Sequence, residues 1–274
     1  MAGPRPQMRC SLILFLFALL PSAAIAQSSA EPAKALTFEF ASIRQNIDRQ
    51  IRWRMSFTTN GVSAVDVTLQ YVLEEAYGLY DSKRWSGGPG WLSERRFNIE
   101  ARFDPAEYKD ITLAKRRIML QHLLADRFGL VVHHEPKELP VYALVVAKQR
   151  PKLVVRKTTD LNPKNIYGSS CLITRDSLNH VEMKDCTTHD FVSVLTPMVA
   201  SDLGRNIVDE TGLTGHNDFD LSWSPEDPAA AARLNSGAPT IFTALEKDLG
   251  LKLKPAKAML DTIVIDRIEM PSQN

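Results

Sequence analysis

The amino-acid sequence predicts an α+β fold built from two tandem repeated halves with mainly antiparallel sheets. The first observation behind this prediction is internal similarity, in which three segments recur in the same order at offsets of 119 to 122 residues. The matched pairs are Asn60–Thr68 with Asn179–Thr187, Phe97–Ile99 with Phe219–Leu221, and Phe128–Leu130 with Leu249–Leu251. The second observation is the order of hydrophobic periods, which gives each half the pattern β-β-β-α-β-α-β-β.

The first half opens with three predicted strands. Phe38–Ile43 alternates between larger apolar and smaller or polar residues, as a strand with one buried face does. Arg54–Thr58 and Val62–Val65 flank Asn60-Gly61, a dipeptide typical of a type I′ turn, so these two strands should form a hairpin.

Two helices follow in the same half. Thr68 is placed to cap a helix that ends at Gly78, because the apolar residues between them recur at three- and four-residue spacing. The same signals predict a second helix, which begins at Thr112 and ends at Gly129.

The remaining strands of the first half surround these helices. Gly87–Gly90 is predicted to be a tight turn, and Arg96–Phe103 alternates as a strand. Leu130–His133 and Val141–Val146 are predicted as two strands, separated by a turn that contains Pro136 and Pro140.

The second half repeats this order after a joint at Lys148–Lys164. Its expected elements are a hairpin between Cys171 and Cys186, helices at Thr188–Val199 and Thr240–Leu249, and strands at Asp218–Trp223, Leu251–Lys254 and Thr262–Ile268. Ser224–Gly237, which is rich in Pro, Ala and Ser, is expected to be a surface loop.

The N-terminus predicts export. Arg5 and Arg9 form a basic region, Leu12–Leu20 is apolar, and Ala24-Ile25-Ala26 has the small-x-small pattern of a cleavage site, so residues 1–26 are interpreted as a signal peptide. The expected domains are then residues 27–150 and 151–274, in the periplasm or outside the cell, with no membrane span after cleavage.

The net charge gives no support for nucleic acid or an anionic membrane as a partner. Without residues 1–26, the chain has 31 Lys and Arg against 32 Asp and Glu, a net charge of −1. A nearly neutral chain gives no electrostatic reason to expect binding to nucleic acid or to an anionic membrane.

Two cysteines remain after cleavage. An even pair in an exported protein favours a disulfide, and a hairpin centred on Leu178-Asn179 would set Cys171 opposite Cys186. A metal site is the alternative, but two cysteines are too few ligands for it, so no metal and no cofactor are expected.

Segments along the whole remaining chain resemble one family. They are Phe38–Ile43, Gly87–Leu92, Arg96–Ala101, Leu123–Phe128, Glu138–Leu144, Asp209–Gly215 and Val264–Pro271. The chain resembles the soil-associated, acidobacterial-type secreted proteins of unknown function, which occur as many paralogues, some of them fused to antibiotic-sensor-type membrane metallopeptidases. The resemblance implies a periplasmic or extracellular protein and carries over no catalytic residue.

Two polar clusters are candidates for chemistry. His133 and Glu135 are two apart on a strand and point to one face, whereas His134 points to the other, and His122 on the preceding helix is a conceivable third metal ligand. In Asp209–Asp218, either terminal aspartate could act as a general base with His216. For both clusters the structural alternative, polar residues at strand ends and turns, is favoured.

The tryptophans suggest a binding surface. Trp85 and Trp91 flank the glycine turn, where a ligand could approach, whereas Trp53 and Trp223 are as readily explained by packing. The candidate ligand-binding residues are therefore Trp85, Trp91 and His216.

Together these features predict a non-enzymatic binding or interaction module for an unknown ligand or protein of the cell envelope. An envelope hydrolase that uses His, Asp and Glu residues is the alternative, and a sensor-associated ligand-binding domain is a third hypothesis. An enzyme should bring His133, His134 or His216 together with a carboxylate in one pocket, whereas a binding module should have an aromatic or apolar cleft.

Overall fold

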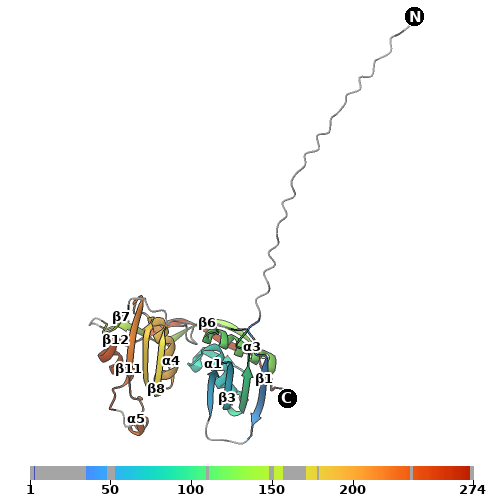
Figure 1. Ribbon diagram of the computed structural model, residues 1–274, viewed down its shortest axis with the longest axis horizontal. Helices are drawn as coiled ribbons and strands as arrows, with labels where there is room; N and C mark the ends of the chain where they lie inside the picture. The colour runs from blue at the N-terminus through green and yellow to red at the C-terminus, as the bar shows by residue number, and fades with distance from the viewer. Residues whose placement is uncertain are drawn as a thin grey trace. The chain divides into compact units, whose positions relative to one another are not determined.

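The computed structural model describes residues 3, 35–47, 53–108, 111–147, 151–156, 171–177, 179–234 and 237–271 (Figure 1). The chain divides into a unit at Met1–Ala35 and a unit at Leu36–Asn274, and the fold belongs to the second. The predicted signal peptide, apart from Gly3, and Leu178 in the expected hairpin turn lie outside the described residues.

The described chain is α+β with mainly antiparallel sheets, as the sequence predicts, and its strands form three four-stranded sheets. The first sheet has the order β1-β5-β3-β2. Its strands are β1 (Phe40–Asn46), β2 (Arg54–Thr58), β3 (Gly61–Thr68) and β5 (Arg96–Arg102).

Two helices pack with this sheet in the first core. The threonine-capped helices are confirmed: α1 (Leu69–Tyr77) lies between Thr68 and Gly78, and α3 (Leu113–Phe128) between Thr112 and Gly129. Their buried faces join those of β3 and β5, with Phe97 and Phe128 in edge-to-face contact at 5.6 Å.

The second sheet has the order β7-β11-β9-β8, formed by β7 (Val154–Arg156), β8 (Leu172–Ser177), β9 (His180–Cys186) and β11 (His216–Ser222). The second core joins this sheet to α4 (Thr188–Leu203), α6 (Ile241–Ala244) and the π-helical turn η2 (Leu245–Leu249). The predicted disulfide between Cys171 and Cys186 is confirmed, with the two Cα atoms 4.5 Å apart.

Several elements differ from the sequence prediction. β7 lies within the expected joint Lys148–Lys164, where it pairs with β11, and α5 (Pro228–Leu234) lies within the expected loop Ser224–Gly237. The short elements η1 (Ser82–Arg84), β4 (Trp85–Gly87), α2 (Trp91–Glu94) and β10 (Ile207–Asp209) were also not predicted. Elements of three or four residues are too short to show a hydrophobic period.

The third sheet contains the largest correction. Its order is β10-β6-β12-β4, and β6 (Val131–Val146) and β12 (Leu251–Arg267) pair antiparallel along their lengths. Each is one strand where the sequence predicted two. Pro136 and Pro140 lie within β6, so the prediction that they mark a turn was wrong.

Strand direction explains why these prolines are tolerated. The amide of Tyr142 donates outward, away from β12, to the carbonyl of Asn206 at 2.9 Å. Pro136 and Pro140 differ from Tyr142 by even numbers, so their nitrogens face the same side. β10 pairs with β6 only at Tyr142–Leu144, and beside both prolines that side of β6 has no strand partner among the described residues.

Each core takes strands from both sides of the predicted boundary at residues 150/151. Ile263, Ile265 and Ile268 complete the first core, whereas Leu144 lies in the second. A hydrogen bond of 3.4 Å from Asn206 to the buried carboxylate of Asp81 also crosses the boundary.

The glycine turn is shaped by β12. Gly87 has φ +83°, and β4 runs parallel to Ile263–Ile265 so closely that a Cβ on Gly87 would lie 2.7 Å from the carbonyl oxygen of Ile265. The turn is therefore fixed by the approach of another strand, which glycine permits.

Gly87→Ala is expected to lower the free energy of unfolding by about 3 kcal/mol, because it adds a clash with backbone to a strained φ. Gly212→Ala is the control: Gly212 also has a positive φ of +66°, but a Cβ there meets nothing within 4 Å. Urea denaturation of both variants separates clash from strain, and equal losses would contradict the explanation.

Candidate ligand pocket

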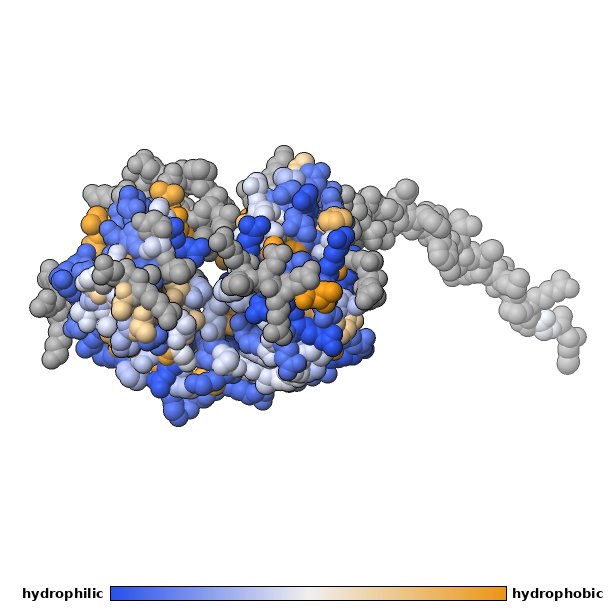
Figure 2. All heavy atoms as spheres, turned by 90° about the horizontal axis from the view of Figure 1, so that it is seen from below, coloured by the Kyte–Doolittle hydropathy of each residue, from blue (hydrophilic) through white to orange (hydrophobic). Residues whose placement is uncertain are grey.

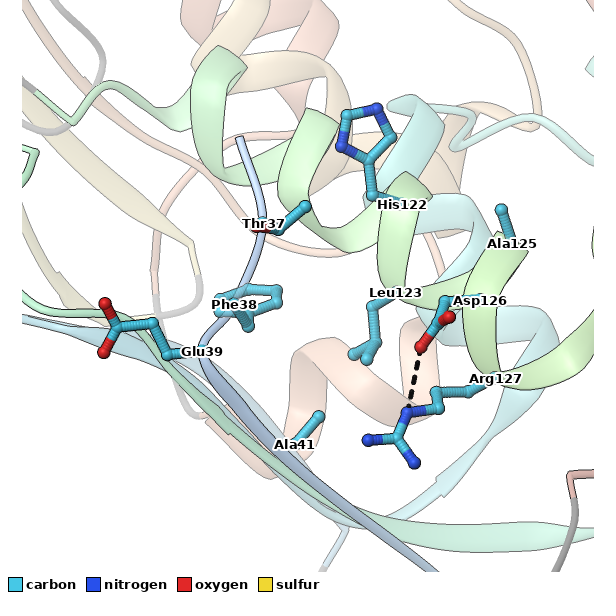
Figure 3. Close-up of a pocket in the computed structure, with 9 residues that line it drawn as sticks. All are labelled: Thr37, Phe38, Glu39, Ala41, His122, Leu123, Ala125, Asp126 and Arg127. Carbon is cyan, nitrogen blue, oxygen red and sulfur yellow. Dashed lines mark ion pairs between the residues drawn. The ribbon is translucent and has the colours of Figure 1, made fainter. Parts of the chain in front are cut away.

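A pocket of about 460 Å³ lies between the start of the first sheet and α3 (Figure 3). Thr37, Phe38, Glu39 and Ala41 line it from the β1 side, and His122, Leu123, Ala125, Asp126 and Arg127 line it from α3. Its volume is within the range of small-molecule sites.

Apolar side chains form two facing walls of the pocket. The ring of Phe38 and the side chain of Leu123 face each other across it in Figure 3, with Ala41 below them. Phe38 is held by packing, since its ring centroid is 6.4 Å from that of Phe103. Leu123 is anchored by the first core, so the apolar wall is preformed.

Polar side chains of α3 also line the pocket. His122 and Asp126, and likewise Leu123 and Arg127, are four residues apart and share a row along α3. Asp126 and Arg127 form an ion pair of 3.1 Å.

His122, which lines the pocket, has a defined tautomer. Its Nδ1 is 2.8 Å from the carbonyl oxygen of Leu36, which can only accept, so Nδ1 carries the proton. In the neutral ring Nε2 is then a free acceptor. Sequence reasoning missed the pocket because its walls come from segments about 80 residues apart.

Trp85 and Trp91 lie elsewhere, partly buried against the first core. Among the described residues, the indole nitrogen of Trp85 is buried without a hydrogen bond of normal geometry. Burial raises the pKa of the nearby Glu74 carboxyl, and Gln70 and the Trp85 N–H oppose that shift. The glycine turn that they flank is occupied by β12, and neither tryptophan lines the pocket between β1 and α3.

His216 belongs to the second sheet. Its Nδ1 lies 2.9 Å from the carbonyl oxygen of Asp185 and 3.3 Å from its carboxylate. It is not brought together with Trp85 or Trp91 in either of the pockets described here.

The other polar candidates form pairs within their sheets. His133 lies 2.9 Å from Asp266, and His134 lies 2.8 Å from Asp261, both exposed on the β6–β12 ribbon. His122 is engaged with Leu36 and not with His133. Across the described residues no group of three or more His, Cys, Asp or Glu side chains is arranged to hold a metal ion.

The aspartates at the two ends of the Asp209–Asp218 cluster accept hydrogen bonds from backbone amides. Asp209 accepts from the amide and hydroxyl of Thr211, and Asp218 accepts from the amide of Asp185 at 3.0 Å. Trp223 is buried in the second core, and Trp53 is exposed.

A buried polar cluster at the end of α1 was not predicted. The Tyr80 hydroxyl donates to Glu75 at 3.3 Å and accepts from Arg117 at 2.6 Å. Burial raises the pKa of Glu75 above its ordinary value of 4.5, although the charge of Arg117 and the Tyr80 hydrogen bond oppose the shift. Burial, followed by the charge of Glu75, raises the pKa of Tyr80 as well.

Glu75→Gln is expected to be more stable than the wild type at pH 7, with a difference that narrows as the pH falls through the raised folded-state pKa and is largely gone by about 4.5. The folded-state pKa of Glu75 is raised, so the stability of the wild type is highest, relative to the variant, below the unfolded-state pKa. That stability is lost as the pH rises through the folded-state pKa and the buried carboxyl ionises. Thermal unfolding from pH 4 to pH 8 measures this, and a difference that is independent of pH would contradict it.

Comparison with known proteins places the chain in a family. Residues 70–268 match a family described as a protein of unknown function, DUF3738. No curated protein and no solved structure matches the chain. None of the helices in the described residues combines the length and apolar composition that crossing a membrane requires. Since the match covers well over half of its length, the chain belongs to this DUF3738 family of unknown function.

Proposed function

We propose that this protein is an exported, non-enzymatic binding module that holds a small organic ligand with an apolar body in the pocket between β1 and α3. The observation that carries the proposal is the pocket itself: about 460 Å³, with a preformed apolar wall of Phe38 and Leu123 beside polar side chains such as His122 and Arg127. This is the usual composition of a ligand site. The signal-like sequence of residues 1–26 supports action in the periplasm or outside the cell.

A tandem duplication is part of this proposal. The first and second sheets have strand orders β1-β5-β3-β2 and β7-β11-β9-β8, in which strands of equivalent chain order take equivalent places. The third sheet has the same correspondence, between β4 and β10 and between β6 and β12. The pocket lies against the first sheet only, so the ligand site belongs to one of the two halves.

Hydrolysis is less well supported by the geometry. His133, His134 and His216 each have an aspartate partner, as a catalytic base would. Within the described residues, however, none of these three histidines hydrogen-bonds a hydroxyl or thiol that could act as nucleophile, and none lines the pocket.

Ala125→Phe tests the site. Ala125 is exposed on α3 and lines the pocket, so a phenyl ring there should fill the mouth without disturbing the core. A fragment screen by thermal shift on the wild type should yield amphipathic hits, and Ala125→Phe should weaken them by about tenfold or more.

Ala114→Phe is the matched control, because Ala114 is exposed on the same helix but does not line the pocket. Its affinities should equal those of the wild type. Hits that bind Ala125→Phe as tightly as the wild type would overturn the assignment of the site.

A further inference from the structure

A second, smaller pocket lies beside an unusual backbone feature, the bulge at Asp66. Asp66 has φ 55°, and the pairing of β3 with β5 shifts register between Ala64 and Val67. The amide of Asp66 donates to Asn98 at 2.9 Å, and its carbonyl accepts from Arg96 at 2.7 Å. The bulge is thus held on both sides by side chains of β5.

The second sheet has the same bulge at Asp185. Asp185 has φ 58°, its amide donates to Asp218 at 3.0 Å, and its carbonyl faces Nδ1 of His216 at 2.9 Å. Thr68 and Thr187 follow at equal distance and cap α1 and α4. The two bulges can therefore be compared position by position.

The comparison shows where they differ. Trp53 and Cys171 hold the same place, each one residue before the edge strand that pairs beside the bulge. At the second bulge Cys171 is bonded to Cys186, and Asp190 completes a capping box with Thr187. At the first bulge Tyr71 stands at the capping position of Asp190 and contacts Trp53 edge-to-face at 5.2 Å.

The first bulge opens into a pocket where the second has a disulfide and a capping box. Its volume is about 130 Å³, and it is lined by Trp53, Asp66, Val67, Thr68, Tyr71 and Arg96. Trp53 is 57% exposed, whereas the other aromatic wall, Tyr71, is partly buried. A large aromatic side chain left this exposed beside a cavity is available for a ligand.

The polar chemistry of the pocket favours an anion at one end. Asp66 is engaged, because its carboxylate accepts from Asn46 at 2.9 Å and lies 3.6 Å from Nη1 of Arg96. Nε and Nη2 of Arg96 make no hydrogen bond within the described residues, and the side chain is 39% exposed. A guanidinium with unused donors suits the two oxygens of a carboxylate.

The other end of the pocket suits an apolar group. Burial raises the pKa of the Tyr71 phenol, and the nearby charges of Glu75 and Glu74 raise it further. A carboxylate would be repelled there, so the anion belongs at Arg96 and the apolar part of the ligand at Trp53 and Tyr71.

We propose that the pocket at the Asp66 bulge is a second binding site, which takes a small carboxylate whose apolar group packs on Trp53 and Tyr71. The carboxylate is that of a free organic acid or the C-terminus of a peptide that ends in an apolar residue. This site is separate from the pocket between β1 and α3, with which it shares no lining residue.

The test is an NMR titration of the purified protein with benzoate, benzamide and benzylamine at one pH. Benzoate should shift the Trp53 indole N–H resonance, and the neutral amide and the cation should bind at least about tenfold more weakly. A Phe-terminated tripeptide with a free or amidated C-terminus tests the peptide source in the same way. Tighter binding of benzoate would identify the ligand as a free organic acid, and tighter binding of the tripeptide with a free C-terminus would identify it as a peptide.

Variants define the site. Trp53→Ala should weaken benzoate about tenfold, whereas Phe40→Ala, which removes a similarly exposed aromatic outside the pocket, should not. Arg96→Lys keeps the positive charge but loses the planar guanidinium that can donate two parallel hydrogen bonds. It should weaken the binding of benzoate and leave unchanged the affinity of ligands for the pocket between β1 and α3. Equal binding of benzoate and benzamide, or a benzoate shift that maps away from Trp53, would overturn the proposal.

Discussion

Replacement of Arg116 by methionine is expected to lower the free energy of unfolding by about 3 kcal/mol. Arg116 lies on α3 and is 3% exposed. Its guanidinium donates to the carbonyl oxygens of Thr58, of Thr59 at 3.1 Å and of Gly61 at 3.3 Å, so one side chain holds the β2–β3 turn. It also lies 5.5 Å from the ring centre of Phe103. Methionine preserves the length of the stem but leaves these carbonyls without their donor.

Urea denaturation measures the loss, with Ala114→Met as the control because Ala114 is exposed on the same helix. The control should change stability by less than about 0.5 kcal/mol. A loss below 1 kcal/mol for Arg116→Met would show that the turn holds without its donor.

The double substitution Cys171→Ala and Cys186→Ala is expected to cost about 3 kcal/mol. The disulfide closes a loop of 15 residues, and its removal increases the freedom of the unfolded chain. Alanine is the right replacement because both positions are buried, where a serine hydroxyl would add a separate penalty.

Chemical denaturation of the wild type with and without a thiol reductant provides the internal comparison. Reduced wild type and the double variant should unfold at similar denaturant concentrations. The stability of the variant should not change with the reductant. A variant as stable as the oxidised wild type would contradict the conclusion that the disulfide stabilises the fold.

The sequence predicted the features that depend on local chemistry. Thr68 and Gly78 bound α1 as expected, because caps act within one turn of a helix. The disulfide followed from two cysteines at the ends of a hairpin. These signals need no knowledge of what packs from elsewhere.

The failures depend on neighbours distant in sequence. Pro136 ends a strand in most settings, but here its nitrogen faces a side of β6 that has no partner strand beside it among the described residues. Gly87 was interpreted as an opening for a ligand, whereas the close neighbour is the backbone of Ile265. Arg116 was not singled out from the sequence, and only the tertiary structure shows the carbonyls that it binds.

The candidate pockets also depend on residues that are distant in sequence. Trp53 was set aside as packing, yet it is the exposed wall of the smaller pocket, because the register of β2 places it beside the bulge. The face shown in Figure 2 is mostly hydrophilic, with hydrophobic residues in small separate groups.

The passage of β12 into the first core has a consequence for biogenesis. Ile263, Ile265 and Ile268 are synthesised long after Ile43, yet they complete the same core. A chain that emerges from its N-terminus, at a ribosome or through a membrane pore, therefore cannot finish its first core until these three isoleucines have emerged. Until then the apolar surface that these isoleucines cover is open to chaperones and proteases, and a chain that stops before Ile263 lacks part of its first core.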